Sequence, residues 1–124
     1  MKLTEAEWAV LDVLWSGERF ALGEVTEDLK ETKGWNKKTV YTYLTRMEAK
    51  GLVNIDRDQE QRHEDRPYSA AVSRESCAKE ERAELLTKVY GGAAGDLIAA
   101  FLKESDISQS EVDRLRKMLD EMEV

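Results

Sequence analysis

The stretch NKKTVYTYLTRMEAKG, residues 36–51, decides the fold of this chain. Asn36 suits a helix N-cap, because its side chain can accept a hydrogen bond from the free N–H groups of the first turn. Gly51 tolerates the left-handed backbone that ends many helices. An apolar stripe with helical spacing lies between them: Val40, Leu44, Met47. The stretch therefore predicts a helix with one buried face.

The opposite face of this helix is basic and rich in short hydroxyl side chains. It consists of Lys37, Lys38, Thr39, Thr42, Thr45 and Arg46, with Tyr41 and Tyr43 beside them. A helix face that is merely solvated more usually mixes glutamate with lysine. We interpret this face as one that lies in the major groove of DNA, the alternative being an ordinary solvated surface.

The composition is that of a globular protein. The chain has 124 residues, of which 41% are hydrophobic and 36% charged, enough for one ordinary domain or two very small ones. Its apolar runs are short and its N-terminus lacks the apolar core of a signal peptide, so we expect a cytoplasmic protein without membrane contact. One cysteine, Cys77, excludes an internal disulfide, and one histidine, His63, leaves little for metal binding. No catalytic set is apparent, so we expect neither an enzyme nor a cofactor.

The net charge of −7 argues against nucleic-acid binding, since contacts with phosphate dominate such affinities. The charge is unevenly distributed, however. Residues 33–50 contain five cations against Glu48 alone, a local balance of +4. The local field matters more than the total when a short element meets the duplex. DNA binding is therefore our main hypothesis, and a winged-helix adaptor that binds other proteins is the alternative.

The residues before the stretch predict two further helices. Thr4 and Glu7 have the spacing of a capping box, in which each side chain bonds the other residue's backbone N–H. Trp8 and Trp15 share a helical stripe, and we interpret them as core residues rather than a ligand-stacking site. A second helix is expected over about residues 23–32, followed by a short glycine-bearing turn. Two helices joined in this way, the second one basic, are typical of a helix-turn-helix.

The residues after the stretch predict a small β-hairpin. Two extended runs, 52–55 and 68–72, flank a segment that is almost entirely charged and suits a hairpin tip. Basic and acidic residues alternate in that segment, so a tip that contacts phosphate and a solvated tip both stay open. The basic residues are Arg57, Arg62, His63 and Arg66, with Arg62 as our candidate phosphate contact. The predicted fold is mainly α with a small β-hairpin, a winged helix-turn-helix.

Residues 73–124 predict three more helices and a dimer. Their expected positions are about 74–90, 93–103 and from the capping box of Ser108 and Glu111 onward. Three helices of this size seldom form a core of their own, whereas one self-complementary stripe can serve both chains of a two-fold dimer. We predict a DNA-binding domain over 1–72 and a helical dimerisation domain over 73–124. The expected interface residues are Leu85, Val89, Leu97, Phe101, Val112, Leu115, Leu119 and Met122.

Motifs along essentially the whole chain resemble those of the penicillinase and methicillin-resistance repressors, bacterial winged-helix transcriptional repressors of antibiotic-resistance genes. The matching pieces are Leu3-Thr4, Glu7-Trp8, Trp15, Trp35, Lys38-Thr39-Val40, Thr42, Thr45-Arg46, Lys50-Gly51-Leu52-Val53, Lys88-Val89-Tyr90-Gly91-Gly92, Phe101-Leu102-Lys103-Glu104, Ile107-Ser108-Gln109 and Glu111. Their order and spacing carry the resemblance, because each piece alone is short.

The resemblance implies a homodimer that binds a palindromic operator in double-stranded DNA and represses nearby genes. By position, the residues facing base edges would be Lys38, Thr39, Tyr41 and Thr42. The residues contacting phosphates would be Lys37, Thr45, Arg46 and Lys50. The family often has arginine where Tyr41 stands, so the operator sequence is expected to differ.

The resemblance also implies a proteolytic switch. In the best-known members, the signal of a membrane sensor leads to a cut in the dimerisation region, before a phenylalanine. The corresponding bond in this chain is Ala100–Phe101, and a sensor-linked protease would be a partner. Those members carry asparagine before the phenylalanine, whereas this chain carries Ala100.

Overall fold

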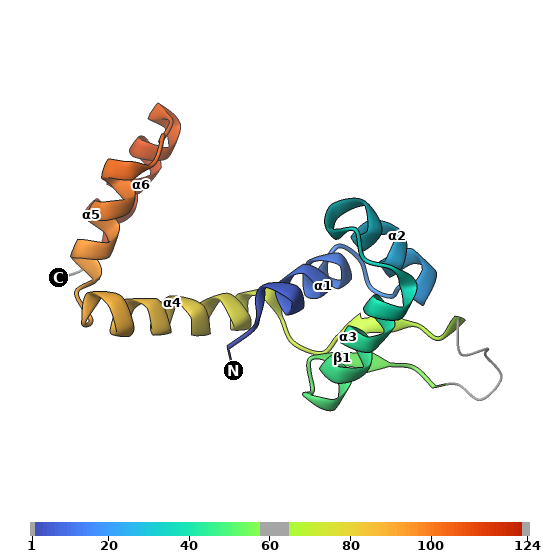
Figure 1. The fold of residues 1–124 in the computed structure, drawn as a ribbon. Helices are drawn as coiled ribbons and strands as arrows, with labels where there is room; N and C mark the ends of the chain where they lie inside the picture. The colour runs from blue at the N-terminus through green and yellow to red at the C-terminus, as the bar shows by residue number, and fades with distance from the viewer. Residues whose placement is uncertain (1, 58–64, 123–124) are drawn as a thin grey trace. The chain divides into compact units, whose positions relative to one another are not determined.

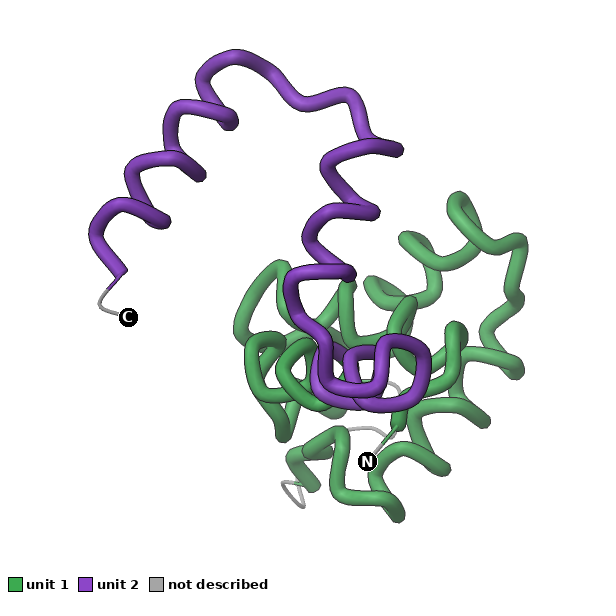
Figure 2. Tube along the Cα trace, turned by 90° about the vertical axis from the view of Figure 1, so that its left-hand side faces the viewer, with its two compact units in different colours: residues 1–81 green, residues 82–124 purple. Residues whose placement is uncertain are grey.

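The computed structural model describes residues 2–57 and 65–122, in which the chain forms six helices and two strands (Figure 1). The elements are α1 (Glu5–Trp15), α2 (Leu22–Lys33), α3 (Lys37–Ala49), β1 (Val53–Ile55), β2 (Tyr68–Ala70), α4 (Arg74–Tyr90), α5 (Ala94–Glu104) and α6 (Gln109–Glu121). The predicted fold, mainly α with a small hairpin, is confirmed. The chain divides into two compact units, residues 1–81 (unit 1) and 82–124 (unit 2), which Figure 2 colours separately.

The helices of unit 1 begin and end at the predicted signals. The backbone N–H of Glu7 donates to Thr4 Oγ1 at 3.1 Å and that of Thr4 to Glu7 Oε1 at 2.9 Å, completing the capping box of α1. The side chain of Asn36 caps α3, accepting from the N–H of Thr39 at 2.9 Å. After α3, Gly51 has a φ of +79°, and the N–H of Leu52 returns to the carbonyl of Met47. This pattern is a Schellman stop, in which a left-handed residue turns the chain out of the helix.

The inner face of α3 is held by the core of unit 1. The predicted stripe of α3 is buried, with Val40 and Leu44 fully enclosed. It belongs to one cluster with residues of α1, α2, the hairpin, the start of α4 and the segments before α1 and β1: Leu3, Val10, Leu11, Val13, Leu14, Leu22, Val25, Leu29, Leu52, Val53, Tyr68 and Cys77. Burying this much apolar surface is the main favourable term for folding the unit. The outer face of α3 is therefore presented on a packed support.

The two tryptophans of α1 pack against this core, as predicted. Their rings meet edge to face, with centroids 5.6 Å apart. The indole N–H of Trp15 donates to the carbonyl of Val72 at 2.9 Å, and the guanidinium of Arg74 lies over the same ring. Arg74 also forms an ion pair with Asp12. These contacts attach the first turn of α4 to α1 within unit 1.

The hairpin pairs β1 with β2 in antiparallel register, with Asn54 opposite Ser69. It also gains a partner that the sequence did not predict. Phe20, in the segment between α1 and α2, exchanges two backbone hydrogen bonds with Tyr68, at 2.9 and 2.7 Å. The segment between α1 and α2 is thereby tied to β2 of the hairpin. We call the hairpin and its connecting residues 56–67 the wing.

Unit 2 consists of the second part of α4, α5 and α6, and it has little core of its own. No residue of the fully described helices α5 and α6 is buried. Large apolar side chains stand in solvent instead: Leu85, Val89, Ile98, Phe101, Leu102, Met118, Leu119 and Met122. Ser108 caps α6, but Glu111 bonds Arg114, so the structure shows only one half of the capping box predicted there. The functional division at 72/73 stays a prediction, and the compact units divide within α4.

Among the described residues, a single helix with the length and hydropathy of a membrane span is not found. Helices α4 and α5 pass that test only when taken together, as a pair bent at the break between them.

Candidate nucleic-acid interface

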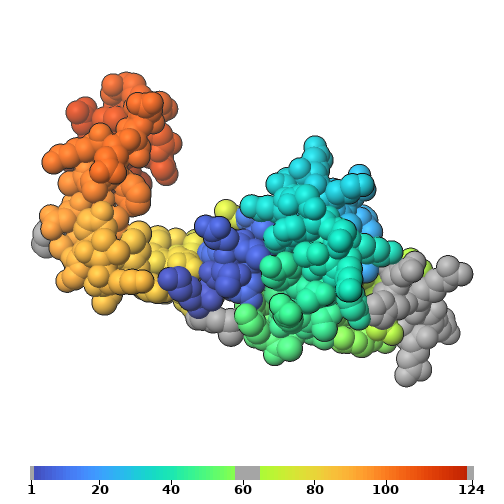
Figure 3. All heavy atoms as spheres, viewed as in Figure 1, coloured from blue at the N-terminus to red at the C-terminus, as the bar shows by residue number. Residues whose placement is uncertain are grey.

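The outer face of α3 carries one continuous row of residues directly opposite the buried stripe. At about 100° per residue, the row consists of Lys38, Thr42, Thr45 and Ala49. Lys38, Thr45 and Ala49 are exposed, and Thr42 is half-buried. Apart from Lys38 these side chains are short, so the helix backbone can approach a partner closely. In the space-filling view, residues of α3 lie at the surface of unit 1 (Figure 3).

Two of the four residues predicted to face base edges, Lys38 and Thr42, lie on this row. The hydroxyl of Thr42 donates to the carbonyl of Lys38 at 2.9 Å, which leaves its methyl group and oxygen for a partner. Thr39 and Tyr41 are half-buried and lie on opposite flanks of the row. Ala49 was missed by sequence reasoning, although its spacing of four from Thr45 was a usable signal.

Of the four residues of α3 and its C-cap predicted to contact phosphate, three are exposed along the helix and one is in an ion pair. Lys37, Thr45 and Arg46 are exposed along α3. Lys50 is the C-cap of α3, and its ammonium lies 2.8 Å from Glu7 Oε2 in α1. Burial by itself would raise the pKa of the Glu7 carboxyl, but hydrogen bonds from Lys50 and Thr4 outweigh it and hold that pKa below its ordinary value. A phosphate contact by Lys50 stays a prediction.

The wing is tied to α3 by a second ion pair. Arg57 makes a two-pronged contact with Glu48, with Nη2 at 2.7 Å from Oε1. The hydrogen bonds from Arg57 lower the pKa of the Glu48 carboxyl. Paired guanidinium and carboxylate groups of this kind have a fixed relative geometry. Arg57 therefore connects the wing to α3, a role that the sequence did not suggest.

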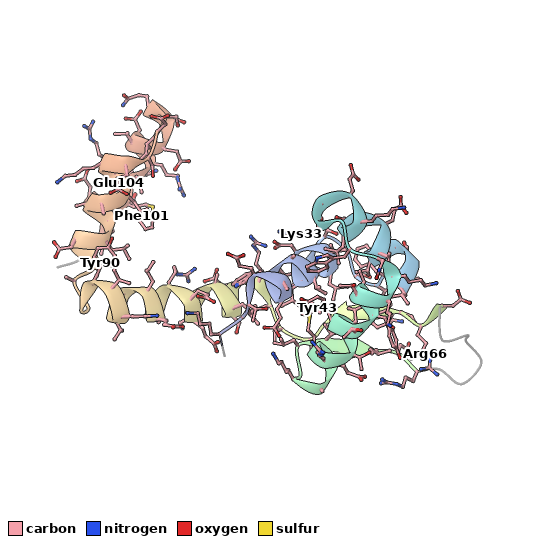
Figure 4. The ribbon with its side chains drawn as sticks, viewed as in Figure 1. Lys33, Tyr43, Arg66, Tyr90, Phe101 and Glu104 are labelled. Carbon is pink, nitrogen blue, oxygen red and sulfur yellow. The ribbon has the colours of Figure 1, made fainter. Side chains whose placement is uncertain are left out.

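The other predicted wing cations are only partly described. Arg62 and His63 lie outside the described residues. Arg66 is half-buried and lies just before β2, on the loop side of the hairpin, where Figure 4 labels it. Its Nε is enclosed and has no hydrogen-bond partner among the residues that the structure describes. On the other side of α3, Tyr43 stacks on Trp35 with ring centroids 4.9 Å apart, which holds the entry to the helix.

The predicted dimerisation residues lie on an apolar surface of unit 2. Val112, Leu115, Leu119 and Met122 line a groove of about 380 Å³ between α5 and α6. The same groove is lined by Ile98, Leu102, Arg116 and Met118, which were not in the predicted set. Leu97 is half-buried, and Leu85, Val89 and Phe101 are exposed. A helix that is apolar around most of its circumference, as α5 is, does not reveal by spacing alone which side meets α6.

The bond Ala100–Phe101, predicted as a cleavage site, lies inside α5. The Phe101 side chain is 55% exposed, and Figure 4 labels it on that helix. Because the bond is helical, α5 has to open locally before its backbone can become extended in a protease.

The described residues contain no group of three or more His, Cys, Asp or Glu side chains that could hold a metal ion. Cys77 is buried, and burial raises the pKa of its thiol, which makes it a core residue rather than a reactive one.

Comparisons with known proteins find similarity over most of the chain. A family model described as penicillinase repressor matches residues 3–121. The methicillin resistance regulatory protein MecI of Staphylococcus aureus (strain N315) is 26% identical over 118 residues, covering 95% of this chain and 93% of that protein. The penicillinase repressor of Bacillus licheniformis is 25% identical over 122 residues, covering 97% and 91%.

A solved structure is also similar. It is the solution structure of the Bacillus licheniformis BlaI monomeric form in complex with the blaP half-operator. The TM-score is 0.51 at 26% sequence identity, covering 60% of this chain and 85% of that one. In that complex a single BlaI chain is bound to half of an operator.

Proposed function

Because the chain belongs to the penicillinase repressor family, as its motifs predicted, we propose that it is a transcriptional repressor that binds a palindromic operator as a homodimer. The observation that carries the proposal is the outer row of α3. Its side chains are short apart from the cationic Lys38, and the helix is held on a packed core. The BlaI complex with half-operator DNA supports the choice of duplex DNA as the partner. A helix placed in this way is what a helix-turn-helix inserts into the major groove.

The proposed contacts divide into those that read sequence and those that position the helix. Lys38 would donate to guanine acceptors, and the methyl group of Thr42 would contact that of thymine. Thr39 and Tyr41, on the flanks of the row, would reach the neighbouring base pairs. The positioning contacts, to phosphates, would come from Lys37, Thr45 and Arg46, with Arg62 of the wing. Bound in this way, the protein would block transcription by occupying the operator.

The dimer would be formed by residues 73–124. The exposed apolar side chains of α5 and α6 support this proposal, because a monomer would leave them in water. A self-complementary apolar face is covered at low cost by a second copy of the same chain. The dimer would hold two α3 helices at a fixed separation, so the second half-site binds at a high effective concentration.

Release would follow from anything that breaks the dimer. A cut at Ala100–Phe101 by a sensor-linked protease would separate α6 from α4 and leave two weakly binding monomers. The helical state of this bond supports a gated cut, which requires local opening of α5. Ala100 stands where the best-known family members carry asparagine, so the protease would need a different residue preference.

Selection from a pool of random duplexes tests the proposed operator. We expect the full-length protein to enrich a two-fold symmetric sequence whose half-sites lie about 10 base pairs apart, or a multiple of that, because successive major grooves on one side of DNA have that spacing. Binding to the enriched duplex should exceed binding to the starting pool by about 10³-fold or more. A pool that stays unenriched would favour the protein-binding adaptor. An enriched sequence without symmetry would argue against the dimer.

A further inference from the structure

One buried carboxylate joins the start of α1 to the end of α3. Glu7 is 4% exposed, and both of its oxygens are occupied. Oε1 accepts from the N–H of Thr4 at 2.9 Å, and Oε2 accepts from the Lys50 ammonium at 2.8 Å. The two residues of the ion pair are 43 positions apart in the sequence. The pair therefore fixes the relation between two elements, rather than the shape of one.

Lys50 is well placed to act on α3 as a whole. It is the C-cap residue, and its backbone is set by the Schellman stop at Gly51. Its charge also lies at the negative end of the helix dipole. In the last turn of the helix, Glu48 binds Arg57 of the wing. The last turn of α3 is thus held from two sides, by α1 and by the wing.

The core and the ion pair hold α3 by different kinds of contact. Val40, Leu44 and Met47 are buried, Tyr41 and Tyr43 pack beside them, and apolar contacts of this kind have little directional preference. A charge-assisted hydrogen bond at the end of the helix adds direction. A recognition element must be held within about half an ångström of its productive position by supporting residues.

We propose that Glu7 and Lys50 are positioning residues for operator binding, whose ion pair sets the angle of α3 on its support. Lys50 then acts through Glu7 and does not neutralise a phosphate. This inference rests on the proposed function, because it assigns residues to the binding of DNA by α3. The burial of Glu7 supports it, since burying a carboxylate is costly unless a partner compensates, and Lys50 is that partner.

The test uses three variants of the full chain, Glu7→Gln, Lys50→Met and the double variant. Affinity for the selected duplex is measured over a salt series, and thermal unfolding is measured in parallel. We expect each single variant to bind about tenfold more weakly with an unchanged salt slope, and the double variant to bind no more weakly than either single one. An unchanged slope is expected because no phosphate contact is lost.

A matched control is available in α2. Glu24 occupies the same position in its helix as Glu7, and its carboxylate accepts from the N–H of Ala21 at 2.9 Å, but it is exposed on the surface. Glu24→Gln should therefore weaken the start of α2, as Glu7→Gln weakens the start of α1, but leave operator affinity unchanged.

Three outcomes would overturn the inference. If Lys50→Met lowers the salt slope by about one per protomer while Glu7→Gln binds normally, Lys50 is a phosphate contact, and the proposed function stands without a positioning role for the ion pair. If Glu7→Gln lowers the unfolding midpoint but binds normally when folded, the pair is only structural. If the unmodified protein binds no duplex, the proposed function fails, and the positioning role of Glu7 and Lys50 fails with it.

Discussion

Replacement of Leu119 by glutamate is expected to weaken binding to the two-fold operator by roughly 10²-fold or more, the typical loss when a bivalent site becomes two single ones. Leu119 is 63% exposed and lines the apolar groove of α5 and α6. A carboxylate there would be buried without a partner in the proposed interface, which prevents association. Affinity for an isolated half-site should not change, because α3 is untouched. Titration of the full operator and of the half-site measures the two affinities. Sedimentation of the protein measures whether it is still a dimer.

Lys117→Gln is the matched control for this variant. Lys117 is exposed on the same helix but does not line the groove, and both substitutions change the charge of the chain by −1. The control should remain dimeric and bind the full operator normally. A Leu119→Glu protein that keeps the dimer mass and its full-operator affinity would show that unit 2 does not form the proposed interface.

Alanine at Lys38 and at Arg46 should weaken binding in two different ways. Lys38 lies on the outer row of α3, and its loss should cost about 1–3 kcal/mol per half-site and relax the preference at one base pair. Arg46 lies beside the row, and its loss should weaken binding to all sequences and reduce the salt slope by about one per protomer. Gel-shift titration of the selected duplex and of single-base variants distinguishes these effects.

Lys79→Ala, an exposed lysine of α4, serves as the control for removal of a surface cation. It should bind the operator as the unmodified protein does. If neither Lys38→Ala nor Arg46→Ala binds more weakly than this control, α3 does not read the groove.

The features of the fold that could be predicted are those decided by local chemistry. Asn36 caps its helix and Thr4 bonds Glu7 because each interaction needs only three or four neighbouring residues. The helix from Arg74 to Tyr90 also lies where the sequence predicted one, over about residues 74–90. At Ser108 the local rule applied in part, because Glu111 had Arg114 as a competing partner.

The features that could not be predicted are pairings between elements distant in the sequence. Phe20 joins the hairpin through Tyr68, and nothing near Phe20 indicates this bridge. The choice of Glu7 for Lys50, and of Glu48 for Arg57, is made by the packing of helices and wing. The sequence has 19 cations and 26 carboxylates, so many pairings are chemically equivalent until the fold selects among them.

The face of α3 that forms the candidate interface could be predicted, but the arrangement of the residues on it could not. The basic, hydroxyl-rich face of α3 followed from helical spacing, because the buried stripe defines the opposite side. The two flanking positions, Thr39 and Tyr41, appeared equivalent to Lys38 and Thr42 until the row was located. The order of these four residues along a groove depends on the tilt of α3, which tertiary contacts determine.

Binding of duplex DNA by α3 is tested most directly by titrating the selected duplex with the full-length dimer between about 50 and 200 mM salt. If Lys37, Arg46 and Arg62 of both protomers neutralise about six phosphates, log K should fall linearly with log salt, with a slope of about −5.4. Affinity that is weak at every salt concentration, with a slope near zero, would contradict operator binding and leave a protein that binds other proteins.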